Sequence, residues 1–320
     1  MSNRNLLIRY QAPAKPRPGS NFGFFSGFLP LFLIALTTEY LASRDIFASD
    51  FQSPRTMALG GAGRAGPLLN DAILLNPSFA AFLKERVSAG VTYQTFAPTP
   101  ATEALGDSTA GTAATGKSYQ ASLQDGRSPL FEAGISYTHL EGGSMIHFGA
   151  SRSFIQRMGF GLGAKFIRDN SLERVTGEAS LSATGVITSE IQTALVIDNL
   201  LQTQESKEQG LYREFAIGAK FNLMGILLFY ADPHYTPELP KALGRPFGYE
   251  AGAELVMFQD IFLRAGLFKD SKAPSIGTWG DGWGMGAGWL GPKISFDFGF
   301  SRVVDPIPSD TWNFGATLYL

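Results

Sequence analysis

Apolar and polar side chains alternate with a period of two along most of the chain beyond residue 86. The clearest example is the stretch 293–302, whose apolar face carries Ile294, Phe296, Phe298 and Phe300. The same alternation recurs at 131–139, 144–153, 158–166, 211–223, 247–257 and 261–269. Strict alternation over such lengths is the pattern of a β-strand with one apolar face. The pattern therefore predicts an all-β chain.

Counting these stretches predicts about fourteen strands, or twelve if the irregular region 175–198 contributes none. We expect them near 87–96, 117–124, 130–139, 144–153, 158–168, 175–184, 190–198, 212–222, 224–232, 247–257, 261–269, 282–290, 292–302 and 311–320. Connections after odd-numbered strands are mostly long (97–116, 199–211, 233–246, 270–281 and 303–310), and those after even-numbered strands are tight. Outer-membrane barrels have this asymmetry, whereas a soluble β-sandwich, the alternative, gives no reason for it. The expected fold is a transmembrane antiparallel β-barrel over residues 87–320.

The last expected strand carries an apolar stripe of Trp312, Phe314, Ala316, Leu318 and Leu320. Barrels inserted into the bacterial outer membrane usually end in such a strand, commonly with an aromatic residue last, where this chain has leucine. We therefore expect the barrel-assembly machinery, acting through this strand, and outer-membrane lipids as partners of a monomeric barrel.

The composition narrows the classes of function. Charged residues are only 17% and apolar residues 44%, with 37 Gly, 26 Phe and a net charge of −2. This mixture argues against disorder and gives no electrostatic attraction to nucleic acid. Zero Cys excludes disulfides and thiolate chemistry, and three separated His make a metal site unexpected. No constellation of catalytic side chains is recognisable, so we expect neither an enzyme nor a cofactor.

The first residues predict export. Arg4, Arg9, Lys15 and Arg17 precede the first acidic residue, and an apolar run follows at 22–36. This run is shorter than the roughly 20 residues that a membrane-spanning helix needs. A short apolar run behind positive charge is typical of a secretory signal peptide. We assign residues 1–48 to it, with an inner-membrane anchor or a core helix as alternatives, and expect the bacterial outer membrane as the location.

Two glycine-rich stretches mimic nucleotide-binding motifs. Residues 111–118 match the phosphate-binding P-loop, and residues 61–66 match a dinucleotide fingerprint. Both motifs require a strand before them and a helix after them. Neither context is present here, so we interpret both matches as chance.

Residues 49–86 have the character of a plug inside the barrel. Pro54, Pro67 and Pro77 prevent a long helix or a paired strand. The stretch is nevertheless too apolar for an exposed linker, and the interior of a wide barrel is the place available for it. Asn76, held extended before Pro77, has an amide free to satisfy backbone groups of the plug or wall, or it simply forms a turn.

The residues 58–63 (ALGGAG), Asp71-Ala72 and Asn76-Pro77-Ser78 resemble the N-terminal signature of the FadL-type outer-membrane proteins. The usual alanine after Asn-Pro is serine here. The resemblance implies a fourteen-stranded barrel with a plug called the hatch. It also implies passage of small hydrophobic molecules, such as fatty acids or hydrocarbons, along a path that the plug gates. The residues to which it assigns plugging or gating are Leu59, Gly60, Gly61, Gly63, Asp71, Asn76, Pro77, Ser78 and Phe79.

Polar positions of the alternating strands predict the charges that face the lumen. These are Lys165, Glu214, Lys220, Glu250, Glu254, Arg264, Lys293 and Asp297. A selective ion pore would favour rings of one sign. Because both signs occur, we interpret these charges as ion pairs within the wall or between wall and plug.

Two features depart from the fatty-acid transporters of this superfamily. The chain is shorter, and its outer connections, such as 269–281, are brief and polar. A second hypothesis therefore stays open, in which a PorV-like barrel transports nothing and serves as a scaffold for secretion or surface attachment.

Overall fold

The computed structural model describes residues 51–320 except 69, 85, 100–114, 129, 141 and 171–172. The predicted signal peptide 1–48 and residues 111–114 of the P-loop match lie outside this described part. The helices are α2 (Pro54–Ala58), α3 (Asp71–Leu75), η1 (Pro77–Phe82) and α5 (Gln204–Glu208). None of the helices in the described residues is long and apolar enough to cross a membrane.

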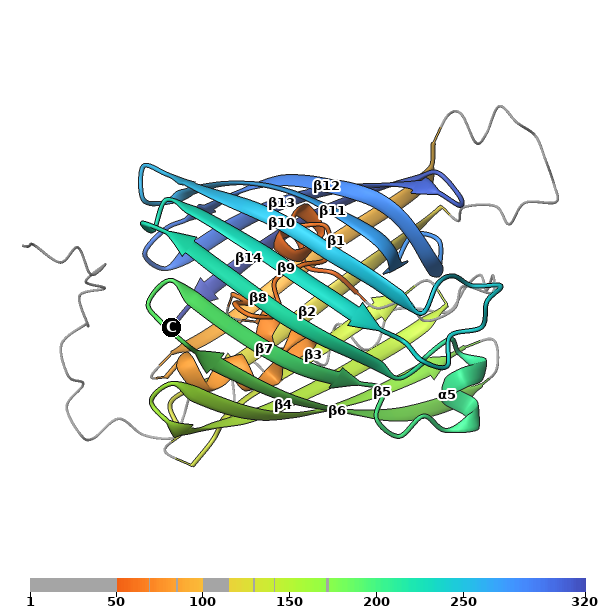
Figure 1. Ribbon diagram of the computed structural model, residues 1–320, viewed down its shortest axis with the longest axis horizontal. Helices are drawn as coiled ribbons and strands as arrows, with labels where there is room; N and C mark the ends of the chain where they lie inside the picture. The colour runs from red at the N-terminus through yellow and green to blue at the C-terminus, as the bar shows by residue number, and fades with distance from the viewer. Residues whose placement is uncertain are drawn as a thin grey trace, which may run out of the picture. The chain divides into compact units, whose positions relative to one another are not determined.

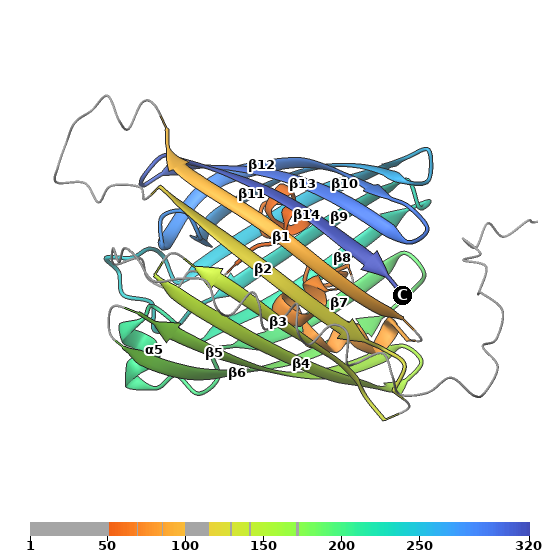
Figure 2. The same cartoon turned by 180° about the vertical axis from the view of Figure 1, so that it is seen from behind.

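The described part of the chain forms fourteen strands in one closed antiparallel barrel (Figure 1), which confirms the predicted all-β barrel and its strand count. The strands are β1 (Val87–Pro98), β2 (Gly116–Asp125), β3 (Glu132–Leu140), β4 (Gly143–Ile155), β5 (Met158–Asp169), β6 (Arg174–Val186), β7 (Ile191–Asp198), β8 (Glu214–Leu223), β9 (Leu227–Tyr235), β10 (Phe247–Met257), β11 (Ile261–Ala273), β12 (Thr278–Leu290), β13 (Ile294–Asp305) and β14 (Ser309–Tyr319). Each strand pairs with its neighbours in sequence. β1 and β14, side by side in Figure 2, close the barrel from Ser88↔Tyr319 to Pro98↔Ser309.

The alternation predicted from sequence separates two faces of each strand, with the apolar face exposed. In β5, Leu162 is 64% exposed, whereas Lys165 is 2% exposed. Along the barrel the buried polar residues are mainly Ser, Thr and Gln, and the exposed large side chains are mainly Phe, Leu and Ile. A soluble protein would expose the polar face instead. An apolar outer face with a polar inner face is the arrangement of a membrane barrel.

The connection between β11 and β12 is shorter than predicted. We expected a loop at 270–281, but β11 continues to Ala273 and β12 begins at Thr278. The pairing shifts register between Phe268 and Ser271 at a β-bulge, where Asp270 has φ 48° and its N–H donates to the Asp281 carboxylate. A bulge breaks the alternation of side chains without ending the strand. The sequence pattern therefore indicated a loop where the sheet continues.

Residues 51–83, which we call the N-terminal segment, contact strands from different parts of the barrel (orange in Figures 1 and 2). α2 packs against β11–β14, α3 against β3 and β4, and η1 against β3–β6. Its helices are short because each is bounded by proline or glycine. Ser53 caps α2 by accepting from Thr56 N–H, and Asn76 caps η1 by accepting from Ser78 N–H. Such caps let the chain change direction every few residues.

Candidate functional site at the interface of the N-terminal segment and the strands

Glycines on the inner faces of the strands let the backbone of the N-terminal segment approach the wall. A Cβ atom built on Gly266 would lie 2.1 Å from the carbonyl carbon of Leu59. On Gly284 a Cβ would lie 2.1 Å from the Met57 carbonyl oxygen, and on Gly161 it would lie 2.2 Å from the Ser78 nitrogen. Gly159, Gly218, Gly252 and Gly299 make similar approaches. Because no larger residue fits, these positions account for part of the chain's high glycine content.

The end of α2 explains the ALGGAG motif. The N–H of Gly61 donates to Thr56 O at 2.8 Å, and the N–H of Gly60 donates to Met57 O at 3.0 Å. This pair of bonds is a Schellman cap, which requires a left-handed residue after the helix. Gly60 and Gly61 have φ of 67° and 93°, a region that costs other residues free energy. The cap turns the chain so that Leu59 and Gly60 lie flat against β10 and β11.

Asn76 links the segment to itself and to β6. Its amide donates to Arg64 O and to Thr184 Oγ1, both at 2.7 Å. Its carbonyl oxygen accepts from the N–H of Ser78 at 3.1 Å and from the Ser78 hydroxyl at 2.6 Å. Ser78 N–H also donates to Ser182 Oγ at 3.0 Å. Asn76 and Ser78 are fully buried, so these bonds satisfy groups that water does not reach.

Arg55 joins one buried ion-pair network. Its Nε lies 3.3 Å from Glu254 Oε2, and its Nη2 donates to the Tyr230 hydroxyl at 2.9 Å. Glu254 also accepts from Arg264 Nε at 2.6 Å, and Arg264 Nη1 reaches Asp297 Oδ1 at 2.6 Å. The Glu254 carboxylate of β10 thus joins α2 of the N-terminal segment to the neighbouring strand β11.

Arg64 joins a second network. Its guanidinium pairs with Glu250, with Glu214 at 2.9 Å and with Asp232 at 3.6 Å. Asp232 also accepts the backbone N–H groups of Gly63 and Arg64, both at 2.8 Å. Burial alone would lower the pKa of Arg64, but Glu250, Glu214 and Asp232 outweigh it and raise that pKa above its ordinary value. Three carboxylates here are therefore held by one permanent cation.

Asp71 is the acidic member of the segment. Burial raises the pKa of its carboxyl to about 6, against the opposing effect of Arg55 and of a hydrogen bond from Ser53. Asp71 therefore changes protonation near pH 6.

The remaining predicted residues take different positions. Lys165, on β5, pairs with Asp198 of β7 at 2.7 Å. Lys220, on β8, lies beside Gly66 with its Nζ 5.9 Å from the centre of the Tyr230 ring. Lys293 is exposed in the turn before β13, because that strand begins only at Ile294. The ring of Phe79 packs on Phe82 with 5.7 Å between the ring centres, and Pro77 is buried. In the described residues no group of three or more His, Asp or Glu side chains is arranged to hold a metal ion.

The sequence reasoning missed Arg55, Arg64 and Asp232, which carry much of the interface. A signal was present. The residues assigned to the lumen include more acids than bases on the strands, once Lys293 is set aside, while residues 53–70 contain two arginines and no acid. Asp232 occupies an inner position in the alternation of β9, together with Tyr230.

A cavity of about 90 Å³, open to solvent, lies between the segment and the wall. Its apolar lining includes Phe51, Leu74, Leu75, Val196 and Trp279. Its polar lining includes Arg64, His147, Lys165, Asp198, Glu214, Glu250 and Lys272. It therefore offers a small molecule both apolar contact and hydrogen-bonding groups.

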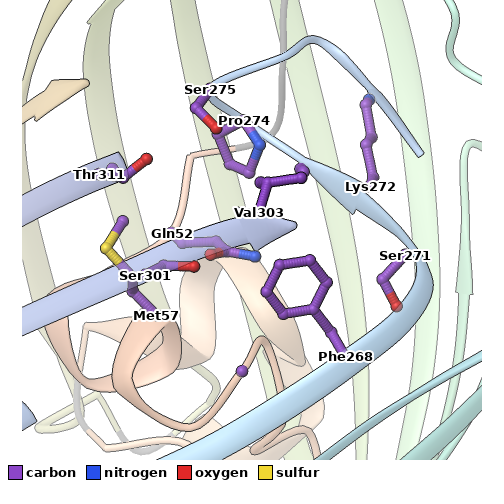
Figure 3. A pocket seen from close by; sticks show the side chains of 12 residues that line it. Gln52, Met57, Phe268, Ser271, Lys272, Pro274, Ser275, Ser301, Val303 and Thr311 are labelled. Atoms are coloured by element: carbon purple, nitrogen blue, oxygen red, sulfur yellow. The ribbon is translucent and has the colours of Figure 1, made fainter. Parts of the chain in front are cut away.

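A smaller cavity of about 10 Å³ adjoins the β11–β12 connection. Figure 3 shows the side chain of Gln52 pointing toward Phe268 of β11, with Val303 of β13 nearby. Met57 of α2 completes the wall on the side of the segment. Both cavities are thus bounded by the N-terminal segment on one side and by strands on the other.

No protein-family model and no curated protein sequence matches the chain. Solved structures do match. The monoaromatic hydrocarbon channel CymD aligns with a TM-score of 0.59 and 11% identity over 85% of this chain and 98% of that chain. The toluene transporter TbuX of Ralstonia pickettii aligns with a TM-score of 0.56 and 11% identity, over 86% and 99%. The toluene transporter TodX of Pseudomonas putida gives 0.56 and 9%, also over 86% and 99%.

At these identities the matches establish the fold. The fold that they show is the barrel fold that the resemblance of residues 58–78 implied. A closed fourteen-stranded barrel with an apolar outer face also fits an outer-membrane protein, as the sequence predicted.

Proposed function

We propose that the protein is an outer-membrane barrel that binds small hydrophobic molecules and passes them along a path gated by the N-terminal segment, which acts as a plug. The observation that carries the proposal is the cavity of about 90 Å³ between that segment and the wall, with its apolar and aromatic lining. A molecule that binds there contacts both the fixed strands and the segment that must move. The fold is also that of CymD, TbuX and TodX, which are a hydrocarbon channel and toluene transporters.

The polar and apolar lining favours particular ligands. Phe51, Leu74, Leu75 and Trp279 provide apolar and aromatic contact for a hydrocarbon or an acyl chain. Leu74 and Leu75 lie at the end of α3, and Asn76 follows them directly. A ligand in contact with these leucines is therefore coupled to the N-terminal segment. Binding at this place therefore gives a direct way to shift the plug.

The test is ligand binding by the purified barrel, measured by calorimetry with toluene, p-cymene and a long-chain fatty acid. Ala216→Phe on β8 fills the cavity, which Ala216 lines. Ala219→Phe on the same strand is the matched control, because Ala219 is exposed on the outer face. We expect saturable binding that Ala216→Phe weakens at least tenfold and Ala219→Phe leaves unchanged.

Absence of binding across the panel would contradict transport. If a protein partner then copurified stoichiometrically with the barrel, the PorV-like scaffold would be the better explanation.

A further inference from the structure

The turns at one end of the barrel carry unusually exposed apolar side chains. In an antiparallel barrel, the connections after even-numbered strands all lie at the same end. Among the described large apolar side chains the three most exposed are Met224 (87%), Phe258 (80%) and Phe154 (79%), and all three lie at this end. Leu130, Phe131, Ile187 and Ile226 are also exposed there. We call the connections 126–131, 156–157, 187–190, 224–226, 258–260 and 291–293, with Phe154, the turn rim.

Two of these side chains are placed at a cost to the backbone. Met224 has φ 57° and Phe258 has φ 51°, and each is followed by a second residue with positive φ. Asn, Asp and Gly adopt this conformation most readily, whereas other residues pay roughly 1–2 kcal/mol. A turn in water gains nothing from a bulky apolar side chain at such a position. The chain therefore has an apolar residue where local geometry favours a polar one.

The turn rim is continuous with the apolar outer face of the barrel. Phe154 packs edge-on against Phe160 of β5, an outward residue, with 5.7 Å between the ring centres. On β11 the outward apolar positions run from Ile261 to Leu267, and the next outward residue is the exposed Lys269. On β11 the lipid-facing surface thus extends into the turn at one end and stops at a charge before the other.

On β11 the turn extends the height of the apolar face. Ile261 and Leu267 are six residue steps apart, about 20 Å along the strand at about 3.3 Å per residue. A tilt of about 40° reduces this span to roughly 15 Å of depth, against an apolar band of about 25 Å in outer-membrane barrels. Continuing three steps to Phe258 adds about 8 Å by the same arithmetic. On this strand the apolar face therefore approaches the thickness of the hydrocarbon when the turn rim is counted.

The charges around the turn rim favour an anionic partner. Exposed basic side chains at this end are Lys84, Arg86, Arg127, Arg152, Arg157 and Lys293. The acidic side chains described there are Asp125, Glu190, Asp260 and the buried Glu132, and Asp125 pairs with Arg127 at 2.8 Å. Exposed apolar groups flanked by basic ones are typical of surfaces that bind anionic lipid.

From these observations we infer that the turn rim is seated in the head-group and upper acyl region of an anionic phospholipid leaflet, and not in water. This inference concerns how the barrel sits in the membrane, and it holds whether or not the barrel transports a ligand.

The absence of cysteine from the chain makes a direct test simple. Phe258→Cys and Met224→Cys are labelled separately with an environment-sensitive NBD dye and reconstituted in vesicles of phosphatidylcholine and phosphatidylglycerol. Lys241→Cys, exposed in the connection between β9 and β10 at the other end, is the control. We expect the dyes at 258 and 224 to emit at shorter wavelength than the dye at 241. We also expect lipid-borne nitroxide, but not aqueous iodide, to quench them.

A second test predicts opposite changes in the urea midpoint of unfolding for a turn rim in water and for a turn rim in lipid. Met224→Asn with Phe258→Asn relieves the strained backbone, so it raises the urea midpoint of unfolding if the turn rim is in water. If the turn rim is in lipid, the midpoint in the same vesicles falls, and its dependence on phosphatidylglycerol weakens.

A raised midpoint, or iodide quenching at 258 and 224 equal to that at 241, would overturn the inference. Quenching by iodide in these vesicles with protection only in native outer membranes would also overturn it, because a protein would then cover the turn rim.

Discussion

Replacement of Gly266 by alanine is expected to release the N-terminal segment while the barrel stays folded. The new Cβ would lie 2.1 Å from the carbonyl carbon of Leu59, 2.2 Å from its oxygen and 2.5 Å from the nitrogen of Gly60. These are backbone atoms held by the Schellman cap, so they cannot turn aside as a flexible side chain does. The clash must be relieved by moving the segment away from β11.

The magnitude follows from the cost of overpacking. Inserting one methyl group into a closely packed contact costs about 1–3 kcal/mol. Because each 1.4 kcal/mol is a factor of ten, the population with the segment displaced should rise by roughly 5- to 150-fold. The barrel itself loses nothing, since alanine is favoured over glycine within a strand by roughly 0.5–1 kcal/mol.

Cleavage by trypsin measures the displacement. Arg55 is buried and Arg64 is paired with Glu250, so trypsin can cut after either arginine only when the segment has moved away from the strands. When the segment opens and closes faster than trypsin cuts, the cleavage rate follows the open population. We expect Gly266→Ala to be cut faster by the factor above, with an increased conductance in planar bilayers. The heat-dependent shift of the folded barrel in gel electrophoresis should be unchanged.

Gly185→Ala is the matched control, because its Cβ would meet only Thr193 Oγ1 at 3.7 Å. If Gly266→Ala were cut at the wild-type rate while folded, close approach to β11 would not be what holds the segment. If instead its barrel failed to fold, the glycine would serve the sheet and the reasoning would be refuted.

Three further outcomes are expected. Glu254→Gln leaves two buried guanidinium groups without their shared carboxylate, so the free energy of unfolding measured in urea should fall by about 3–5 kcal/mol, against about 0–1 kcal/mol for Asp310→Asn in a more exposed pair. Asn76→Ala removes two buried donors and should weaken docking of the segment by about 1–3 kcal/mol, seen as faster tryptic cleavage. Burial raises the pKa of Asp71 to about 6, so the docked state binds the extra proton and should become less protected from trypsin as the pH rises from about 4 to above 6, whereas Asp71→Asn should show a smaller slope.

The strands of the barrel could be predicted because the pattern that defines each strand lies within a few consecutive residues. Whether a side chain of β5 or β13 faces lipid or lumen depends on its parity along the strand, and parity is visible in a few consecutive residues. The same local pattern failed at Asp270, where a bulge shifts the parity while the hydrogen-bonded ladder continues to Ala273.

The partners of the N-terminal segment could not be predicted in the same way. Arg55 and Glu254 are 199 residues apart, and Arg64 and Glu250 are 186 apart. Nothing in a local pattern selects Glu254 rather than another inward acid, because the choice depends on which strands α2 packs against. Gly266 of β11 and Gly284 of β12 set that packing, and their role is visible only when the N-terminal segment is placed against the strands.

The kind of contact at this interface bears on whether the segment can move. The buried arginine pairs fix the register of the segment, but the cost of removing charges from water offsets much of their attraction. Burial of apolar surface is the main source of stability in most cores, and the segment buries Met57, Leu59 and Ile73 almost completely. Ion pairs and close backbone approach therefore set where the segment lies, whereas its buried apolar side chains supply much of what holds it there. A ligand that contacts α3 at Leu74 and Leu75 can displace the segment only by the difference between its binding free energies for the displaced and the docked states.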